Sequence, residues 1–175
     1  MDKKQIIADI NRMINDLLTQ VARFSDENFN SKPASEGWSA GEVSEHLLKL
    51  VKNVNRNLRA RTMPPGRPDS EKIDIISTVF DDYERKYHAP EQIIPSADQK
   101  NKADMLSQLE KHHRQLVEVV ENYDLSEICK GFNHPSLGAF TRLEWIYFIV
   151  HHGHRHIQQM ANILQEQTLE TANND

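Results

Sequence analysis

The sequence of 175 residues predicts an all-α protein, a four-helix bundle with a long crossover between its second and third helices. Three observations support this fold class. Apolar residues recur at steps of three and four in four long segments, which is the pattern of amphipathic helices. Two of these segments begin with a capping box, and a long stretch divided by prolines separates the second segment from the third.

The first helix is expected over residues 3–24. Charged residues lie between its apolar positions, so that one face is apolar and the rest is polar. The apolar positions are Ile6, Ile7, Ile10, Met13, Ile14, Leu17, Leu18 and Val21. Residues 24–37 break this pattern with serine, asparagine, proline and glycine, and they are expected to form a loop.

The second helix has a clear start at Ser39. Ser39 as the N-cap and Glu42 three residues later form a capping box, and Trp38 before it can pack on Val43 as a hydrophobic staple. The helix is expected to end near Arg61, before two consecutive prolines. Its inward positions are Val43, His46, Leu47, Leu50, Val51, Val54 and Leu58. One histidine therefore lies on an apolar face.

Residues 62–101 are the least regular part of the chain. Five prolines divide them, and residues 73–87 carry the apolar positions of a short helix. Their length exceeds that of a tight turn between neighbouring helices and predicts a crossover connection. Helical periodicity resumes over residues 102–123, where one of His112 and His113 is expected to face inward at the edge of the core. A second loop follows.

The fourth helix begins with the same pattern as the second. Thr141 and Glu144 form a capping box, and Phe140 can pack on Trp145 as a staple. The helix is expected to reach about Gln167. Its inward positions are Trp145, Phe148, Ile149, His152, His156, Gln159, Met160 and Ile163.

Two of these inward residues, His152 and His156, lie one helical turn apart. A step of four residues advances about 400° around a helix, so the two side chains are about 40° apart on one face. They can share a metal ion. Gln159 either accepts the other N–H of His156 or caps a polar pocket by chance, and the sequence leaves both interpretations open. Hydrogen bonding of two core histidines to neighbouring side chains is the alternative. His151 and His154 flank this pair and are expected to face solvent, although they could serve as ligands in an alternative register.

Facing helices of a bundle build sites in its core from inward side chains. Here the second helix offers His46, and the fourth offers His152 and His156. Three protein ligands and an open position are the pattern of a catalytic metal site, whereas closed structural zinc sites use four ligands and usually cysteine. The single Cys129 cannot supply that closed alternative. The sequence assigns no catalytic acid or base and no residues that bind an organic cofactor, since the capping box explains Glu42.

Composition excludes several function classes. A net charge of -5 without a Lys/Arg cluster argues against a nucleic-acid partner. The longest strictly apolar run, residues 145–150, is far short of the roughly 20 residues that cross a bilayer, so no membrane partner is expected. One cysteine excludes an intramolecular disulfide and favours the cytoplasm. Residues 1–167 are predicted to form a single domain, and residues 168–175, which lack apolar anchoring, a flexible tail.

Three pieces of the sequence carry a resemblance to a known family. They read G-W-S-A-G-E-V-S-E-H-L at residues 37–47, H-P-S-L-G-A-F-T-R-L-E-W at residues 134–145, and H-x-x-x-H-x-x-Q from His152. In order and spacing they resemble the DinB-like superfamily, which includes the YfiT-type proteins. The resemblance implies a four-helix bundle with a long crossover and a divalent metal, nickel or zinc, held by His46, His152 and His156.

The same resemblance implies a metal-dependent enzyme that acts on a small molecule, either a thiol-dependent S-transferase or a hydrolase. A metal ion can bind a thiol or a water molecule in its open position and lower its pKa. A low-molecular-weight thiol is then a second expected cofactor, although nothing in the chain names a particular thiol. The alternative is a non-catalytic module, a homodimer that binds a small molecule or a partner, because no general acid or base is evident near the histidines.

Overall fold

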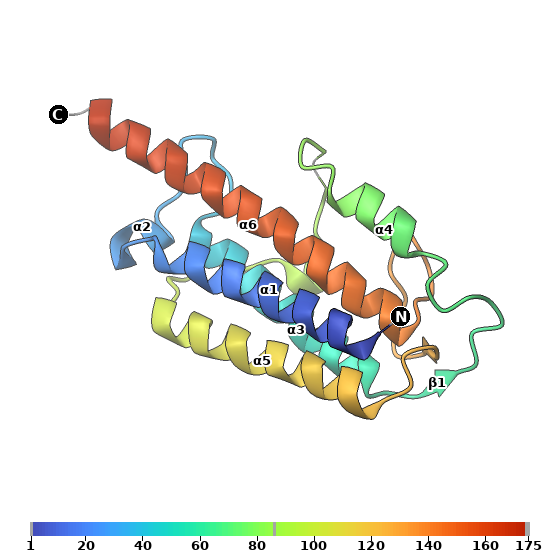
Figure 1. The fold of residues 1–175 in the computed structure, drawn as a ribbon. Helices are drawn as coiled ribbons and strands as arrows, with labels where there is room; N and C mark the ends of the chain where they lie inside the picture. The colour runs from blue at the N-terminus through green and yellow to red at the C-terminus, as the bar shows by residue number, and fades with distance from the viewer. Residues whose placement is uncertain (1, 86, 174–175) are drawn as a thin grey trace.

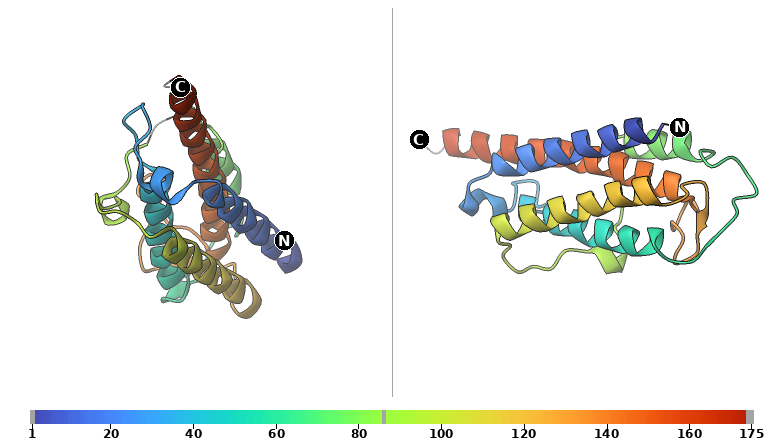
Figure 2. Two further views of the ribbon diagram at one scale, coloured as in Figure 1. Left: turned by 90° about the vertical axis from the view of Figure 1, so that its left-hand side faces the viewer. Right: turned by 60° about the horizontal axis from the view of Figure 1, so that its bottom comes forward.

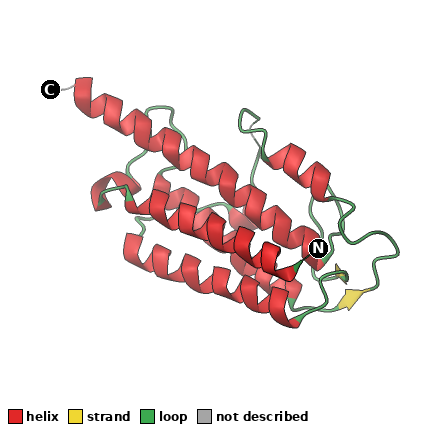
Figure 3. Ribbon diagram, viewed as in Figure 1, coloured by secondary structure: helices red, strands yellow, loops and turns green. Residues whose placement is uncertain are grey.

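The computed structural model describes residues 2–85 and 87–173 and shows a bundle of four long helices (Figure 1). The long helices are α1 (Lys3–Ala22), α3 (Ala40–Leu58), α5 (Lys102–Asn122) and α6 (Arg142–Asn173). Short elements occupy the connections between them, and little of the described chain is strand (Figure 3). The predicted fold class is confirmed.

The long helices follow a crossover topology rather than a simple up-and-down order. α1 and α6 run in one direction, and α3 and α5 run in the other (Figures 1 and 2). α1 packs against α5 and α6, and α3 packs against the same two helices. The connection from α3 to α5 returns along the length of the bundle, as its length predicts. Because α3 and α6 are antiparallel neighbours, their inward histidines can meet.

The connection between α3 and α5 contains a short helix, α4 (Ile73–Phe80), and a 3-10 turn, η1 (Glu91–Ile93). α4 is the short helix that the apolar positions of residues 73–87 predict, but it ends at Phe80. Ile76 and Phe80 are its buried residues, and the helix packs against α6. η1 packs against α3. The crossover is thus tied to both helices that carry the inward histidines.

Three short elements lie in segments for which the sequence predicts loops or an irregular connection. α2 (Asp26–Asn30) is anchored by the buried Phe29. The strands β1 (Thr62–Met63) and β2 (Ile128–Cys129) pair antiparallel, with Thr62 opposite Cys129. Strands of two residues are too short to show an alternating pattern, so periodicity cannot find them. The pairing joins the segment after α3 to the segment before α6.

Both predicted capping boxes are present. At α3, the backbone N–H of Glu42 donates to the Ser39 hydroxyl (3.2 Å), and the backbone N–H of Ser39 donates to the Glu42 carboxylate (2.8 Å). At α6, Thr141 and Glu144 make the same two bonds at 3.1 and 2.9 Å. The ring of Phe140 lies 4.9 Å from that of Trp145, as the staple requires.

The end of α6 differs from the prediction. The helix continues past Gln167 to Asn173, so residues 168–173 are helical, and residues 174–175 lie outside the described residues. No glycine or proline interrupts this stretch, and the Thr168 hydroxyl donates to the carbonyl of Leu164 at 2.8 Å. Backbone hydrogen bonds within a helix do not depend on apolar anchoring, and its absence is therefore a weak signal for a helix end.

The close packing of α1 against α6 is set at Gly153, between the two histidines of α6. A Cβ built on Gly153 would lie 2.4 Å from the sulfur of Met13 on α1. Glycine in a helix interior is unfavourable by about 1 kcal/mol relative to alanine, and here it admits the neighbouring helix.

Within residues 2–85 and 87–173, none of the helices has the length and apolar character needed to cross a membrane.

Candidate metal centre

His46 of α3 and His152 and His156 of α6 converge in the bundle, as their inward positions predict. The Nε2 atom of His152 lies 3.1 Å from that of His46 and 3.0 Å from that of His156. The ligand atoms of all three residues lie within 4.8 Å of one another. His46 and His156 are buried, and His152 is partly exposed. The three imidazoles therefore direct one nitrogen each toward a common point.

Acceptors on the far side of two rings fix which nitrogen carries the proton. Nδ1 of His46 lies 2.8 Å from the carbonyl of Ile93, and Nδ1 of His156 lies 2.7 Å from Oε1 of Gln159. Because each of these oxygens accepts, each Nδ1 donates, and the lone pair of a neutral ring is left on Nε2. Gln159 thus orients His156, one of the two interpretations the sequence leaves open.

These tautomers leave the contacts at His152 incompletely satisfied. The Nε2 atoms of His46 and His156 both present lone pairs toward Nε2 of His152. A neutral imidazole has one N–H, so it can donate to only one of them. At the other contact, a lone pair then faces a nitrogen about 3 Å away that has no hydrogen left to donate. A cation at the common point would satisfy all three nitrogens at once.

Protonation of the rings does not relieve this conflict easily. Burial lowers the pKa of all three histidines. For His156 burial, together with the charge of His46, lowers the pKa to about 3. For His152 burial is again the largest cause, followed by the charges of His156 and His46. The rings are neutral at neutral pH, which is the form that binds a metal ion.

The three nitrogens fit a divalent ion. Imidazole nitrogens bind zinc at about 2.0–2.1 Å, so two of them on one ion lie roughly 3 Å apart, close to the separations at His152. His152 differs from the other two histidines on the side of its ring that points away from the common point. Its Nδ1 is buried and has no hydrogen-bond partner among the residues that the structure describes. The rings of Phe80 and Phe148, with centroids 5.3 and 5.2 Å away, hold this imidazole by packing instead.

Other histidines of the chain lie outside this group. His151 faces Asp81, with Nδ1 2.9 Å from a carboxylate oxygen, and His154 is partly exposed. The pair that meets His46 is therefore His152 and His156, and not His151 and His154. His113 is the inward member of its pair, and it is buried with Nδ1 donating to the carbonyl of Leu109 at 2.6 Å.

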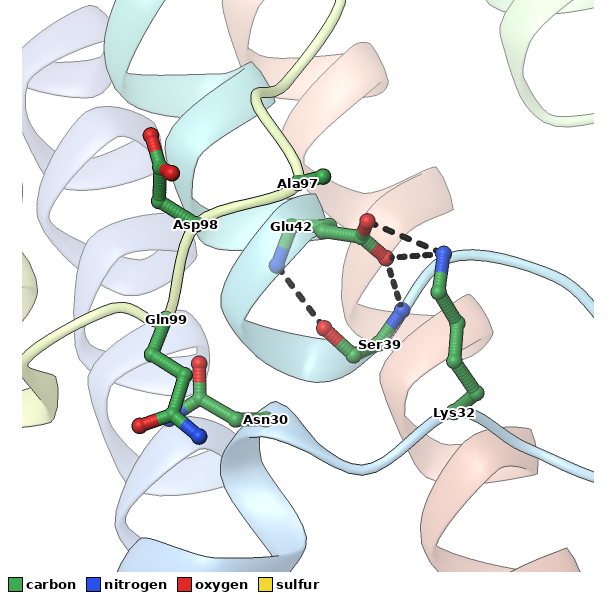
Figure 4. Close-up of a pocket in the computed structure, with 7 residues that line it drawn as sticks. All are labelled: Asn30, Lys32, Ser39, Glu42, Ala97, Asp98 and Gln99. Carbon is green, nitrogen blue, oxygen red and sulfur yellow. Dashed lines mark hydrogen bonds and ion pairs between the residues drawn. The ribbon is translucent and has the colours of Figure 1, made fainter.

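Glu42, one turn before His46, serves the capping box rather than the histidines. Its carboxylate accepts from the backbone N–H of Ser39 and from Lys32, as Figure 4 shows. The small hollow in Figure 4 is lined by these residues and by the segment before α5, and none of the three converging histidines lines it. The structural interpretation of Glu42 accounts for every contact it makes there.

Two groups next to the histidines are not evident from the sequence. The carbonyl of Ile93 comes from the crossover, and a backbone oxygen carries no sequence signal. The ring of Trp38 lies 5.0 Å from that of His46, although its place before the capping box predicts a staple on Val43. Both groups reach His46 only because the segments before and after α3 fold back onto it.

Comparisons with known proteins show similarity in sequence and in fold. Residues 9–160 match the family model described as the DinB superfamily. The chain is 30% identical over 142 residues to the uncharacterized protein YuaE of Bacillus subtilis, covering 81% of this chain and 86% of that one. Its fold is similar to that of YfiT from Bacillus subtilis, with a TM-score of 0.60 and 13% identity over 95% of this chain and 87% of the other. YfiT is described as a probable metal-dependent hydrolase with an unusual four-helix bundle topology.

Proposed function

The chain belongs to the DinB superfamily, and we propose that it is a metal-dependent enzyme with a nickel or zinc ion held by His46, His152 and His156. The observation that carries this proposal is the convergence of three Nε2 atoms, two of them with lone pairs fixed by acceptors at Nδ1. Three protein ligands leave a position open for a reacting group.

The side chains around the site hold the ligands in the form that the reaction needs. A divalent ion in this position would lower the pKa of a thiol or a water molecule, which gives a nucleophile at neutral pH. The carbonyl of Ile93 and the amide of Gln159 keep the protons of His46 and His156 on Nδ1. Phe80 is buried and packs against the ring of His152.

Transfer of a low-molecular-weight thiol onto an electrophilic small molecule is the reaction that we favour. The group of candidate ligands in the described chain contains three histidines and no carboxylate. Thiol transfer onto a carbon that bears chloride needs no acid, because the sulfur–carbon bond forms, the carbon–chlorine bond breaks, chloride leaves and the thiol proton passes to solvent. The description of YfiT as a probable hydrolase supports water as the alternative nucleophile.

Metal content is the first test of this proposal. Protein purified without a His-tag or a metal column is expected to hold about one nickel or zinc ion per chain, by elemental analysis. His46→Ala and His152→Ala are expected to lose it. His151→Ala is the matched control, since His151 is next to a ligand but faces Asp81, and it should keep the metal. A parent protein that stays metal-free after dialysis against both ions would contradict the site.

Activity is the second test. Metal-loaded protein is incubated with several thiols and chlorodinitrobenzene, and separately with nitrophenyl esters in the absence of thiol. Thiol transfer predicts a rate above that of His46→Ala in the first assay, and hydrolysis predicts it in the second. If neither assay exceeds the control while metal is bound, the non-catalytic and dimeric binding module becomes the better account.

We propose the cytoplasm as the compartment of this protein, because its cysteine, Cys129, is a free and buried thiol.

A further inference from the structure

The two tryptophans of the chain have different surroundings. Trp145 is 1% exposed and packs on the rings of Phe132, Phe140 and Phe148, with centroids 5.0, 4.9 and 5.5 Å away. Trp38 is partly exposed, and in the described chain its ring contact is with His46. Trp145 therefore belongs to the core, whereas Trp38 packs against the edge of the core and lies between His46 and solvent.

The indole of Trp38 contacts the ring of His46, which carries one of the three converging nitrogens. Its centroid lies 5.0 Å from the ring of His46, which in turn lies 4.8 Å from that of His156 and 5.3 Å from that of His152. Ser39 follows Trp38 directly and is buried, with both capping-box bonds in place. The backbone at the base of the indole is thus fixed by the start of α3.

The phenylalanines beside His152, Phe80 and Phe148, are already enclosed. Phe80 packs on the ring of His152, but it is 6% exposed and is also in contact with Tyr87 and Phe148. A molecule that approaches the histidines from solvent cannot reach the faces of Phe80 without moving these neighbours. The partly exposed indole of Trp38 is the aromatic surface that such a molecule can meet.

We propose that Trp38 is a specificity-determining residue that binds the flat aromatic group of an electrophilic substrate beside the metal position. This inference rests on the proposed function for the identity of the reaction, and it adds the class of substrate. An indole offers a large, rigid surface and favours offset stacking with another ring. Its proximity to His46 places the bound ring next to the nucleophile, which is how positioning raises a rate.

Binding of dinitroaniline tests this proposal without turnover. Dinitroaniline is a flat aromatic without a chloride to displace, and its affinity for zinc-loaded protein is measured by calorimetry. Trp38→Ala is expected to weaken binding about tenfold, and Trp38→Phe, which keeps a ring, about twofold or less. Phe132→Ala is the matched control, because Phe132 is also an exposed aromatic residue but contacts Trp145. It should bind as the parent does.

The outcomes separate this proposal from the proposed function. Trp38 offers no ligand atom, so Trp38→Ala should keep its metal, and a loss of dinitroaniline binding then reports the aromatic subsite. If the parent does not bind dinitroaniline, or if Trp38→Ala binds it equally well, the subsite is wrong even when metal and activity are present. If the parent holds no metal, the function fails, while dinitroaniline binding to the metal-free protein still tests Trp38.

The same variants give a second readout where activity exists. The rate with chlorodinitrobenzene is expected to fall about tenfold in Trp38→Ala, whereas the rate with iodoacetamide, an acceptor without a ring, should change little. An equal loss with both acceptors would mean that Trp38 acts through the position of His46 rather than through the substrate, and would overturn the proposal.

Discussion

The starts of α3 and α6 use one sequence pattern in two environments. Each has an aromatic residue, a hydroxyl N-cap and a glutamate three residues later, and each makes both bonds of a capping box. At α6 the carboxylate of Glu144 is fully buried and also accepts from Arg67, at 2.6 and 2.7 Å, and from the backbone N–H of Lys72 at 2.9 Å. At α3 the carboxylate of Glu42 pairs with Lys32, whose side chain is 57% exposed.

The comparison teaches that a local signal for a helix start does not say what the start is used for. The start of α6 is covered by the crossover, because Arg67 and Lys72 bind Glu144 there, and the tryptophan of this start is buried. At the start of α3 the glutamate pairs with an exposed lysine instead, and the partly exposed tryptophan lies against His46. One helix start therefore serves the fold, and the other lies beside the candidate site. The predictions below test this division.

The largest effect is expected for Glu144→Ala. This variant leaves the guanidinium of Arg67, which is 17% exposed, without its carboxylate, and breaking a pair of this kind costs about 3–5 kcal/mol. The free energy of unfolding, measured by urea denaturation with circular dichroism, should fall by that amount. A loss below 1 kcal/mol, within the range of a surface pair, would remove the contrast between the two helix starts.

A smaller effect is expected from metal binding, which should depend on His46 of α3 and not on Glu144 at the start of α6. A ligand that binds only the folded state stabilises it by about 2.7 kcal/mol when its free concentration is a hundredfold above its dissociation constant. Zinc should therefore raise the thermal midpoint of the parent protein and of Glu144→Gln, but not that of His46→Ala. A rise in His46→Ala equal to that of the parent would place the metal elsewhere.

Acid should weaken the α6 start through Glu144. Burial raises the pKa of this carboxyl, but hydrogen bonds from Arg67 and from the backbone of Thr141 and Lys72 outweigh burial and hold the pKa below the ordinary value of 4.5. A lowered pKa in the folded state contributes stability above that value, and the contribution is lost as pH falls through the folded pKa. Urea midpoints of Glu144→Gln should therefore fall less on acidification than those of the parent. Parallel curves would contradict this assignment.

The smallest effect is expected for Glu42→Ala at the α3 start. Loss of the capping bond and of an exposed ion pair with Lys32 should cost about 1 kcal/mol. The change lies outside the histidine group, so metal content should not alter. Urea denaturation and elemental analysis of the same preparation check both statements. A loss as large as that of Glu144→Ala would show that the two starts carry equal weight.

The three converging histidines could be found from the sequence because their signals are local. His152 and His156 share a face by their spacing alone, and His46 lies on the apolar stripe of the helix that begins at Ser39. The roles of Glu42 and Glu144 as capping residues follow from the same short-range rules. Each of these inferences involves residues within a few helical turns, where the geometry is fixed by the backbone.

Other features have no local signal. The carbonyl of Ile93 that orients His46 lies 47 residues further along the chain, and its hydrogen bond depends on how the crossover settles on α3. The β1–β2 pair and the burial of Phe29 in α2 also come from contacts between distant segments. The helical extension of α6 to Asn173 was missed because apolar periodicity reports packing, and this stretch needs only its own backbone bonds.

By itself the sequence determined the four long helices, their two capped starts and the three inward imidazoles. Periodicity and capping depend on residues three or four positions apart in the chain. The tertiary structure alone decided that α3 and α6 lie side by side and antiparallel, so that the three Nε2 atoms meet. It also decided that Glu144 is buried beside Arg67 while Trp38 stays at the surface beside His46. Burial and charge pairing are set by residues far apart in sequence, which is why one pattern pairs its glutamate with a largely buried arginine at α6 and with an exposed lysine at α3.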